Sequence, residues 1–457
     1  MVEKPAEVRG REENMTRIAI LGAGMAGFGA SNRLLKEGVR SVIYEKKPYH
    51  GGHTASFKFD SGFIFDDGPH ISFTKNERIQ KIFAESVNNE FETIQARTNN
   101  YWQGHWIKHP VQCNLYGLPK DLIVDVLRDF IYAQNNHYGE IKTYADWLYA
   151  SFGKTFSETF PMEYGLKYHT TKADNMSTDW LGQRVYRPNL DEVSQGALSP
   201  VTPDVHYIDH FRYPSHNGFV SYLDKFPSQT DIRLNHGLIK LDPRARKLYF
   251  ENSVMCSYEY IISSIPLPDL IPLISGVPAD VIEASQRLSY STVVVVNIGV
   301  NREDISEAHW TYFYDPDFFF TRLNFPHMLS PNNVPHGAGS IQAEVYYSKK
   351  YRPLDRSPGE CIHPVISDLK RCGLIRGDDK ILYRGATIAP YANVIFDLDR
   401  ADALATVHGY LDDIGVIYCG RYGEWGHHWT DESFISGENA AQRVLDSMCP
   451  RSVSSRA

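Results

Sequence analysis

The most regular pattern of apolar and polar positions lies between residues 17 and 45. Residues 18–21 form a short apolar run, as expected of a parallel strand that is buried on both faces. A glycine-rich turn at 22–27 leads into a segment with apolar residues on one helical face, which ends near Gly38, and residues 42–44 are again apolar and extended. This order predicts a strand, a turn, a helix and a second strand, the unit from which parallel sheets are built.

The rest of the chain mixes helical and extended patterns. The segment around Ser61 and Gly62 alternates like a β-hairpin. Near the C-terminal end, a short apolar strand stops at Gly420, and we expect a helix to begin near Ser436. We also predict helices within 76–91 and 118–152, and strands at 231–235, 238–241, 247–250, 260–264, 289–300, 310–326 and 340–348, with 231–235 paired to 238–241.

These elements predict an α/β protein with an inserted domain. The chain has 457 residues, more than one ordinary domain, and the segment 76–212 shows helical spacing without a second glycine-rich turn after a strand. We therefore interpret 76–212 as an insertion into a dinucleotide-binding domain. Residues 1–14 are charged and lack an apolar stretch, so we expect a disordered extension there and no secretory signal.

The glycine-rich turn has the spacing of a dinucleotide-binding motif. Gly22, Gly24 and Gly27 follow the pattern G-x-G-x-x-G. The first glycine permits the tight turn, the second lets a pyrophosphate approach the backbone, and the third lets the helix pack on the strand. Glu45 ends the second strand, 21 positions after Gly24, where an acid can accept hydrogen bonds from a ribose 2′-OH. Because an acid there disfavours a 2′-phosphate, FAD or NAD is favoured over NADP.

Two further glycine-containing turns follow Glu45. Gly51 and Gly52 mark a backbone that turns tightly or approaches a ligand closely, which fits a flavin better than a nicotinamide cofactor. Gly68 and Pro69 then break the hairpin directly before His70. We expect this break to hold His70 on a stiff turn.

Composition and charge narrow the classes of partner. The net charge is −8 and no long run of Lys or Arg occurs, which argues against nucleic acid or an anionic membrane as the main partner. The most apolar stretch, 293–300, is too short to span a bilayer. The six cysteines show no C-x-x-C pair and no metal-ligand spacing. We expect free thiols, no metal and a cytoplasmic protein that acts on a small molecule, with a homo-oligomer left open.

Two arginines are candidates for substrate binding. Arg322 lies among aromatic residues on a predicted strand, where a buried guanidinium needs an anion or carbonyl groups as partners. A phosphate or carboxylate of the substrate would meet this need, and so would Glu344 on the neighbouring predicted strand. Both interpretations stay open. Arg184 is a similar candidate, with a surface ion pair as the alternative.

Three histidines are candidates for proton transfer, because imidazole titrates near neutral pH. His70 could contact a flavin or move a proton, and the alternative is a turn histidine bonded to the backbone. His427 and His428 stand between two tryptophans, and adjacent residues of an extended loop point in opposite directions. We therefore expect at most one of them to face the ligand, and assign His427 to substrate binding.

The motifs resemble those of the flavin superfamily that contains amine oxidases, protoporphyrinogen oxidase and UDP-galactopyranose mutase. GAGMAG with Glu45 and the Gly51-Gly52 pair is similar to its first FAD signature, and GRYGEW followed by SGENAA is similar to its C-terminal one. Residues 68–71 and 106–111 most resemble the mutase and mutase-like proteins of carbohydrate loci. The resemblance extends in order over most of residues 15–445.

The resemblance implies FAD bound by a discontinuous Rossmann-like domain, made of 15–75, 213–290 and 385–450, with an inserted α+β substrate domain made of 76–212 and 291–384. The helix from Ser436 would point its positive end at the flavin ring. The implied catalytic residues are His70 and Arg322, and the implied substrate-binding residues are Arg184, Arg322 and His427. The implied cofactor-binding residues are Gly22, Gly24, Met25, Ala26, Gly27, Glu45, Lys46, Gly51, Gly52, His53, Gly68, His70, Gly420, Arg421, Ser436 and Gly437.

The resemblance implies an FAD-dependent oxidoreductase of the amine oxidase and protoporphyrinogen oxidase type, with hydride transfer from the substrate to flavin N5. A sugar nucleotide or another carbohydrate is the substrate class it suggests. The alternative is a mutase-like isomerase that uses reduced FAD without net redox. The chain departs from the mutase pattern at 72–74 and 426–429, which puts the mutase chemistry in doubt more than the flavin. A third alternative, a nucleotide-binding protein without catalysis, would lack flavin reduction by any donor.

Overall fold

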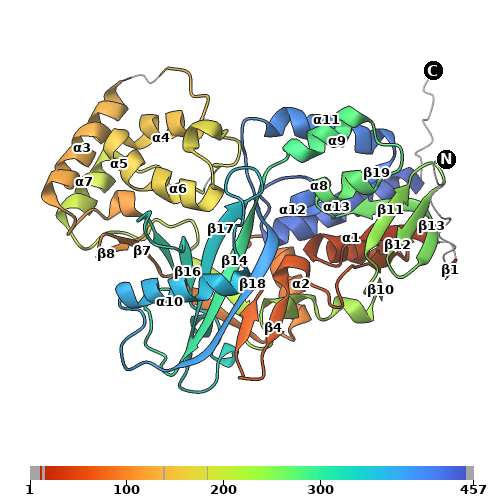
Figure 1. Cartoon of the computed structure of the whole chain (residues 1–457), viewed down its shortest axis with the longest axis horizontal. Helices are drawn as coiled ribbons and strands as arrows, with labels where there is room; N and C mark the ends of the chain where they lie inside the picture. The colour runs from red at the N-terminus through yellow and green to blue at the C-terminus, as the bar shows by residue number, and fades with distance from the viewer. Residues whose placement is uncertain (1–10, 13–15, 137–138, 183, 449–457) are drawn as a thin grey trace.

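The computed structural model describes residues 11–12, 16–136, 139–182 and 184–448. Figure 1 shows two large sheets, with a helical lobe beside the second one. The extension expected at 1–14 lies outside the described residues except for Arg11–Glu12 (β1), which pairs in parallel with β13. Cys449 also lies outside them.

The first sheet is an eight-stranded, mainly parallel sheet. Its parallel part contains β10 (Asp231–Arg233), β3 (Val42–Tyr44), β2 (Thr16–Leu21), β13 (Val254–Ser263) and β19 (Val416–Tyr418), and the antiparallel strands β12 (Lys247–Phe250) and β11 (Leu238–Asp242) extend it. The apolar run of β2 is buried on both faces, as predicted. Ile18 and Ile20 pack into one core cluster, and Ala19 and Leu21 pack into another on the opposite face.

Helices cover both faces of this sheet. The helix α1 (Met25–Lys36) and α13 (Thr430–Met448) contribute to one core cluster, and α9 (Ala279–Arg287) and α11 (Arg400–Asp413) to the other. The short helices α8 (Leu267–Leu270) and α12 (Gly420–Gly423) complete this part of the chain. The result is the doubly covered sheet of a Rossmann-like domain, which confirms the predicted fold class.

The predicted pairing of 231–235 with 238–241 is wrong. The strand β10 pairs in parallel with β3, where Ile232 lies opposite Ile43, while β11 pairs with β12. The segment after β10 is also tied to the end of β3, because the backbone N–H of His236 donates to the carbonyl of Glu45 over 2.8 Å. The hydrogen-bonding groups that a hairpin would need are therefore already used by β3.

The C-terminal helix begins at Thr430, one and a half turns before the predicted start near Ser436. Asp431 and Glu432 lie in its first turn, where carboxylates favour the positive end of a helix, and Glu432 accepts a 2.7 Å hydrogen bond from the N–H of Trp429. The expected helix start near Ser436 is therefore wrong, and Gly437 lies inside the helix. A Cβ at Gly437 would overlap with the carbonyl oxygen of Ala26, so this glycine permits close packing of α13 on α1.

The second sheet has seven strands and is mostly antiparallel. The predicted buried strand is β14 (Tyr290–Val300), and it pairs on one side with β18 (Ile381–Val394) and on the other with β17 (Gly339–Ser348). The sheet continues through β16 (Arg322–Asn324), β15 (Trp310–Phe313), β7 (Thr98–Trp102) and β8 (His105–Lys108). The strand predicted at 310–326 is two antiparallel strands, β15 and β16, and β16 pairs with β17.

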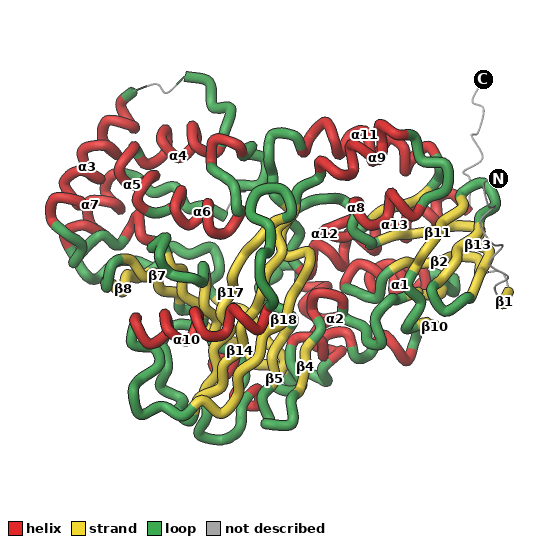
Figure 2. Tube along the Cα trace, in the orientation of Figure 1, coloured by secondary structure: helices red, strands yellow, loops and turns green. Residues whose placement is uncertain are grey.

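The helical lobe stands beside the second sheet (Figure 2). It consists of α3 (Lys120–Asn135), α4 (Tyr144–Phe152), α5 (Lys154–Thr159), α6 (Pro161–His169) and α7 (Leu190–Leu198), which share an apolar core. The hairpin of β4 (Ser56–Lys58) and β5 (Ile64–Asp66) forms as predicted. The remaining elements between the sheets and at their edges are α2 (Glu77–Ser86), β6 (Phe91–Gln95) paired with β9 (His210–Pro214), and α10 (Ile362–Arg371).

The second sheet includes β18 up to Val394, ten residues beyond the expected end of the substrate domain at 384. The expected bounds of the FAD-binding and substrate domains stay a prediction. Within the described residues, no helix is long and apolar enough to cross a membrane.

Candidate active site

The glycine-rich turn has the conformation that its spacing predicts. Gly22 has φ +103°, and a Cβ there would overlap with Ser264 Oγ. A Cβ at Gly27 would overlap with the carbonyl oxygen of Gly22, so only glycine lets α1 pack this closely on β2. At Gly24 a Cβ would lie 3.8 Å from Gly52 Cα, which is an ordinary contact distance, so a side chain here would not overlap with the protein.

The N-terminus of α1 follows this turn directly. Gly24 is its N-cap and offers no side-chain partner for the first-turn N–H groups of Met25 and Ala26. The side chains of Met25 and Ala26 are buried. A helix end of this kind presents backbone donors and a positive field to an anion.

Glu45 ends β3 beside the turn. Its Oε2 accepts a hydrogen bond from the N–H of Ala23 over 2.9 Å, and its Oε1 accepts one from the N–H of Lys47 over 2.9 Å. The side chain is buried, and each carboxylate oxygen retains a lone pair for a further donor. Lys46, the next residue, is exposed.

The second glycine cluster lies against the first. Gly51 and Gly52 have φ values of +108° and +57°, and the N–H of Gly51 donates to the carbonyl of Ala23 over 2.8 Å. His53 follows in the same turn, with its ring 5.1 Å from that of Tyr422. Burial, with Lys47 nearby, lowers the pKa of His53 to about 3, so this imidazole is neutral at physiological pH.

His70 is bonded to the backbone of its turn, and its predicted contact with a flavin stays a prediction. Its Nδ1 hydrogen-bonds to the carbonyl of Gly68 over 2.7 Å, which requires the proton on Nδ1 in the neutral ring and leaves Nε2 as an acceptor. The same side chain lines a cavity. Burial lowers the pKa of His70 to about 4, and the charges of Arg421 and Arg322 act in the same direction.

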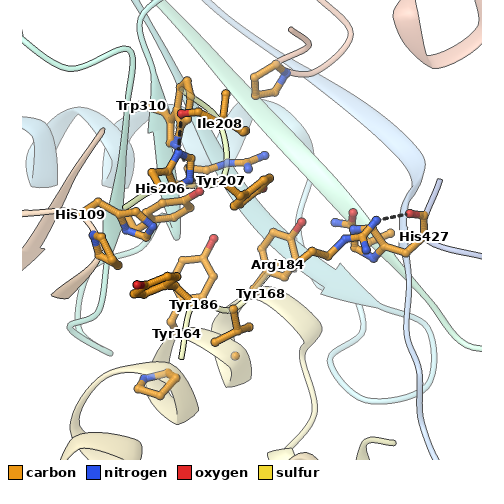
Figure 3. A pocket seen from close by; sticks show the side chains of 18 of the residues that line it. His109, Tyr164, Tyr168, Arg184, Tyr186, His206, Tyr207, Ile208, Trp310 and His427 are labelled. Atoms are coloured by element: carbon orange, nitrogen blue, oxygen red, sulfur yellow. Dashed lines mark hydrogen bonds between the residues drawn. The ribbon is translucent and has the colours of Figure 1, made fainter. Parts of the chain in front are cut away.

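That cavity has a volume of about 350 Å³ and lies between the helical lobe, the second sheet and the C-terminal loop (Figure 3). Aromatic and imidazole side chains from distant segments form its wall. They come from α6, from 184–186, from 206–208 and from β15. The labelled members of the wall are His109, Tyr164, Tyr168, Arg184, Tyr186, His206, Tyr207, Ile208, Trp310 and His427.

Arg322 and Glu344 form an ion pair at the edge of this cavity. Arg322 Nη2 donates to Glu344 Oε1 over 2.9 Å, and Nε donates to the other carboxylate oxygen. Glu344 is 2 % exposed, and Arg322 lines the cavity. The internal partner of Arg322 is therefore Glu344, and its charge is largely neutralised before any ligand binds.

Arg184 and Arg421 line the same cavity, and among the described residues neither donates a hydrogen bond to a carboxylate. Arg184 Nη2 donates to the carbonyl of His427 over 2.6 Å, and its guanidinium lies 4.7 Å from the ring centre of Trp429. Arg421 Nη1 donates to the carbonyl of Ala392 over 3.2 Å. In both residues Nε is buried and has no partner among the described residues. Within the part of the chain that the structure describes, Arg184 does not form the surface ion pair that was the alternative.

His427 and His428 both line the cavity, in different surroundings. The ring of His427 lies parallel to that of Trp180 at 6.5 Å. Burial lowers the pKa of His427 well below its usual range, and Arg421 and Arg184 add to this effect. His428 instead places Nε2 3.3 Å from Glu424 Oε2. The expectation that at most one of the two faces the ligand stays a prediction.

The predicted residues thus fall into two groups. His70, Arg184, Arg322, Arg421 and His427 line the aromatic cavity, whereas the glycine turn, Glu45 and the second glycine cluster form the helix-end cradle. Ser436 and Gly437 lie on α13, which packs against α1. Ser436 Oγ accepts the N–H of Gly420 over 2.7 Å, and a Cβ at Gly420 (φ +74°) would lie 2.8 Å from Ala26 Cβ.

Sequence reasoning missed the tyrosines of the cavity wall. Tyr164 and Tyr168 are spaced by one helical turn on α6, a spacing that could have marked them as one face of a helix. Their rings stack at 5.5 Å. In the part of the chain that the structure covers, no three His, Cys, Asp or Glu side chains gather as metal ligands.

Comparison with known sequences finds limited similarity. A family model described as an NAD(P)-binding Rossmann-like domain matches residues 20–86. A 15-cis-phytoene desaturase from Synechococcus elongatus is 33% identical over 69 residues, 15% of either chain, and one from Capsicum annuum is 22% identical over 266 residues, 52% of this chain and 43% of the other. The chain thus matches less than half the length of these curated relatives.

Comparison with solved structures covers almost the whole chain. A reduced UDP-galactopyranose mutase has a TM-score of 0.89 with 24% identity, covering 95% of this chain and 96% of the other. An Exiguobacterium protein assigned as a protoporphyrinogen oxidase has a TM-score of 0.70 with 14% identity, covering 94% and 98%. Putrescine oxidase bound to putrescine has a TM-score of 0.64 with 14% identity, covering 95% and 100%. The chain therefore shares its overall fold with these three solved structures, and its residues 20–86 match a Rossmann-like dinucleotide-binding domain.

Proposed function

We propose that the chain is an FAD-dependent enzyme that acts on an anionic sugar derivative such as a sugar nucleotide. The residues present fit FAD. The uncapped end of α1 after the glycine turn suits a pyrophosphate, and the carboxylate of Glu45 retains lone pairs for ribose hydroxyls. The other residues proposed to hold FAD are Gly22, Met25, Ala26, Gly27, Lys46, Gly51, Gly52, His53, Gly68, His70, Gly420 and Arg421, with Ser436 and Gly437 supporting them from behind.

The positive charge of the cavity wall is the observation that supports an anionic substrate. Among the described residues, the wall contains three arginines and no aspartate or glutamate. Glu344 compensates Arg322, so the charges of Arg184 and Arg421 remain for a ligand. A cationic amine would be repelled from this wall, whereas a phosphate or carboxylate would satisfy both guanidinium groups. The stacked tyrosines of α6 offer flat surfaces to a sugar or a base.

Bound FAD would supply two-electron redox chemistry. The chain's own part is to hold the anionic group with Arg184 and Arg421, to stack the ring against Tyr164 and Tyr168, and to exclude water with the aromatic wall. His70 presents Nε2 as a neutral acceptor for a ligand N–H or O–H, since its Nδ1 proton is used by Gly68. This arrangement suits an oxidoreductase that removes hydride from a bound carbon.

The second candidate is isomerisation of a sugar nucleotide without net redox. The observation that favours it is the extent of the fold similarity to the mutase, with a TM-score of 0.89 over 95% of the chain. Both candidates use the same binding residues and the same cofactor. They differ in whether the flavin changes its oxidation state after one complete turnover.

Anaerobic mixing of the FAD-loaded protein with UDP-galactopyranose, or with putrescine, tests the proposal. We expect the sugar nucleotide to perturb the flavin spectrum and putrescine to leave it unchanged. Bleaching of oxidised flavin would support the oxidoreductase, and conversion of the sugar by dithionite-reduced protein without a net spectral change would support the isomerase. A response to putrescine alone would contradict the proposed substrate class.

Variants of the two arginines sharpen this test. Loss of one charge-assisted hydrogen bond from Arg184→Ala or Arg421→Ala should raise KM for the sugar nucleotide by about tenfold or more. The control is Arg128→Ala, which removes an exposed arginine of α3 that pairs with Asp125. Equal effects of all three variants would contradict the assigned roles.

A further inference from the structure

A chain of polar contacts links the C-terminal glycine turn to the cavity wall through Glu424. The N–H of Gly420 donates to Ser436 Oγ over 2.7 Å, and the Ser436 hydroxyl donates in turn to Glu424 Oε1. Glu424 Oε2 lies 3.3 Å from His428 Nε2. Because Ser436 is already an acceptor for Gly420, its own proton points to Glu424.

The position of Glu424 indicates which ring nitrogen of His428 carries the proton and which keeps a free lone pair. An acceptor 3.3 Å from Nε2 favours a proton on that nitrogen, which leaves the lone pair on Nδ1. His428 Nδ1 is buried and has no hydrogen-bond partner among the described residues. The side chain belongs to the wall of the cavity. His428 thus pairs one ring nitrogen with an acid and keeps the other as an unused base.

The charges around His428 set its protonation. Burial lowers the pKa of His428, the positive charges of Arg421 and Arg184 act in the same direction, and the carboxylates of Glu424 and Glu432 oppose them. His427, the neighbouring titratable ring, stacks on Trp180. The resting imidazole is therefore neutral, and the imidazolium formed by proton uptake would lie next to a carboxylate that stabilises it.

We propose that His428 is a catalytic residue that takes a proton from a substrate hydroxyl, and that Glu424 is its positioning residue. In this step the substrate O–H bond breaks, an N–H bond forms at Nδ1, and the substrate oxygen keeps the electron pair. The reverse transfer returns the proton to the product. The assignment rests on the proposed function, because it requires a hydroxyl-bearing ligand in the cavity, and it adds a base that differs from His70.

His427 is not equivalent to His428. Its backbone carbonyl accepts a hydrogen bond from Arg184, and its ring lies among Trp180, Phe396 and Trp429. These contacts suit stacking against a ligand ring. Of the two histidines, it is His428 that lies beside an acid, Glu424.

The test uses FAD-loaded wild type, His428→Asn and Glu424→Gln, with UDP-galactopyranose as the probe and kcat and kcat/KM measured across about pH 5 to 9. His428→Asn should lower kcat about a hundredfold or more at an unchanged ratio of FAD to protein, and added imidazole should restore part of the rate. Glu424→Gln removes the charge that stabilises the imidazolium, so the acidic limb of the kcat/KM profile should move to lower pH by about one unit. A purely structural role would not move this limb.

The matched control is His210→Asn, an exposed histidine of β9 whose Nδ1 lies 2.9 Å from Asp209, outside the cavity. This variant should retain the rate and profile of wild type. If wild type turns over the probe and His428→Asn keeps both its rate and its pH profile, the role of His428 is wrong while the proposed function stands. If wild type holds FAD but its spectrum does not respond to the probe, the proposed function is wrong and the role of His428 falls with it.

Discussion

Glu45 accepts a 2.9 Å hydrogen bond from the backbone N–H of Ala23, so the acid that ends β3 is tied directly to the glycine turn before α1. The Glu45 carboxylate thereby stabilises the turn and also belongs to the helix-end cradle. Its second oxygen holds the N–H of Lys47 at 2.9 Å. The position of the acid relative to the turn is fixed before any ligand arrives, which lowers the entropic cost of binding.

Glu45→Gln should raise the Kd for FAD by about tenfold, because a charge-assisted hydrogen bond to ribose is replaced by a weaker neutral one. The amide oxygen can still accept one backbone N–H, so the melting temperature should fall less than in Glu45→Ala. Fluorescence titration of the apoprotein with FAD measures the effect. Glu37→Gln makes the same change at the exposed end of α1 and should leave the Kd unchanged; an unchanged Kd in Glu45→Gln as well would contradict the ribose role.

Gly27→Ala should destabilise the protein by about 1–3 kcal/mol or more, because its Cβ would overlap with the carbonyl oxygen of Gly22 and push α1 away from β2. Gly409→Ala is the matched control. Gly409 is exposed within α11, and no atom lies within 4 Å of a Cβ placed there. This change should stabilise the protein by about 0.5–1 kcal/mol. Urea unfolding of both variants checks the prediction, and equal effects would contradict the packing role of Gly27.

Glu344→Gln should cost about 3–5 kcal/mol of stability, because it leaves the Arg322 guanidinium without its charged partner. The double variant Glu344→Gln/Arg322→Met should recover part of this loss, since it removes the stranded charge. Urea unfolding of both single variants and the double variant gives the coupling energy. Additive losses would show that the two side chains do not stabilise each other.

Stability should fall as the pH drops from about 6.5 toward 4. Burial lowers the pKa of His169 and His53 to about 3 and that of His70 to about 4, so the unfolded chain binds more protons than the folded one between these values and the ordinary value of 6.5. Stability that is present above pH 6.5 is therefore lost through this window. Asp66 opposes the trend in part, because burial raises its pKa to about 6.

Urea unfolding at several pH values measures this slope. Each such histidine contributes up to about 1.4 kcal/mol per pH unit, so His169→Gln should reduce the slope by that amount. His210→Gln, at an exposed position, should not change it. A slope of zero or of the opposite sign in wild type would contradict the neutral state of these buried rings.

The sequence predicted those parts of the molecule that depend on neighbours along the chain. The β2, turn and α1 unit follows from an apolar run and three glycines, and the φ values and close contacts at Gly22 and Gly27 agree with their spacing. The ion pair of Arg322 with Glu344 was one of two open alternatives, because adjacent antiparallel strands can place such residues opposite each other.

The remaining features depend on tertiary contacts. The partner of β10 was missed because proximity in sequence favoured β11, while the burial of Ile232 beside Ile43 decided the pairing. The cavity wall could not be assembled from sequence, since Tyr164, Tyr207 and Trp310 come from segments that meet only in the folded chain. The start of α13 was readable in principle from Thr430, Asp431 and Glu432.

The measurement that tests the central claim most directly is the visible absorption spectrum of the purified protein, before and after acid precipitation. The account predicts two flavin bands that remain in the supernatant, as expected of FAD held without a covalent bond. The buried Cys419, whose pKa burial raises, is not placed to be a reactive thiolate. A colourless protein that also fails to take up added FAD would contradict the account.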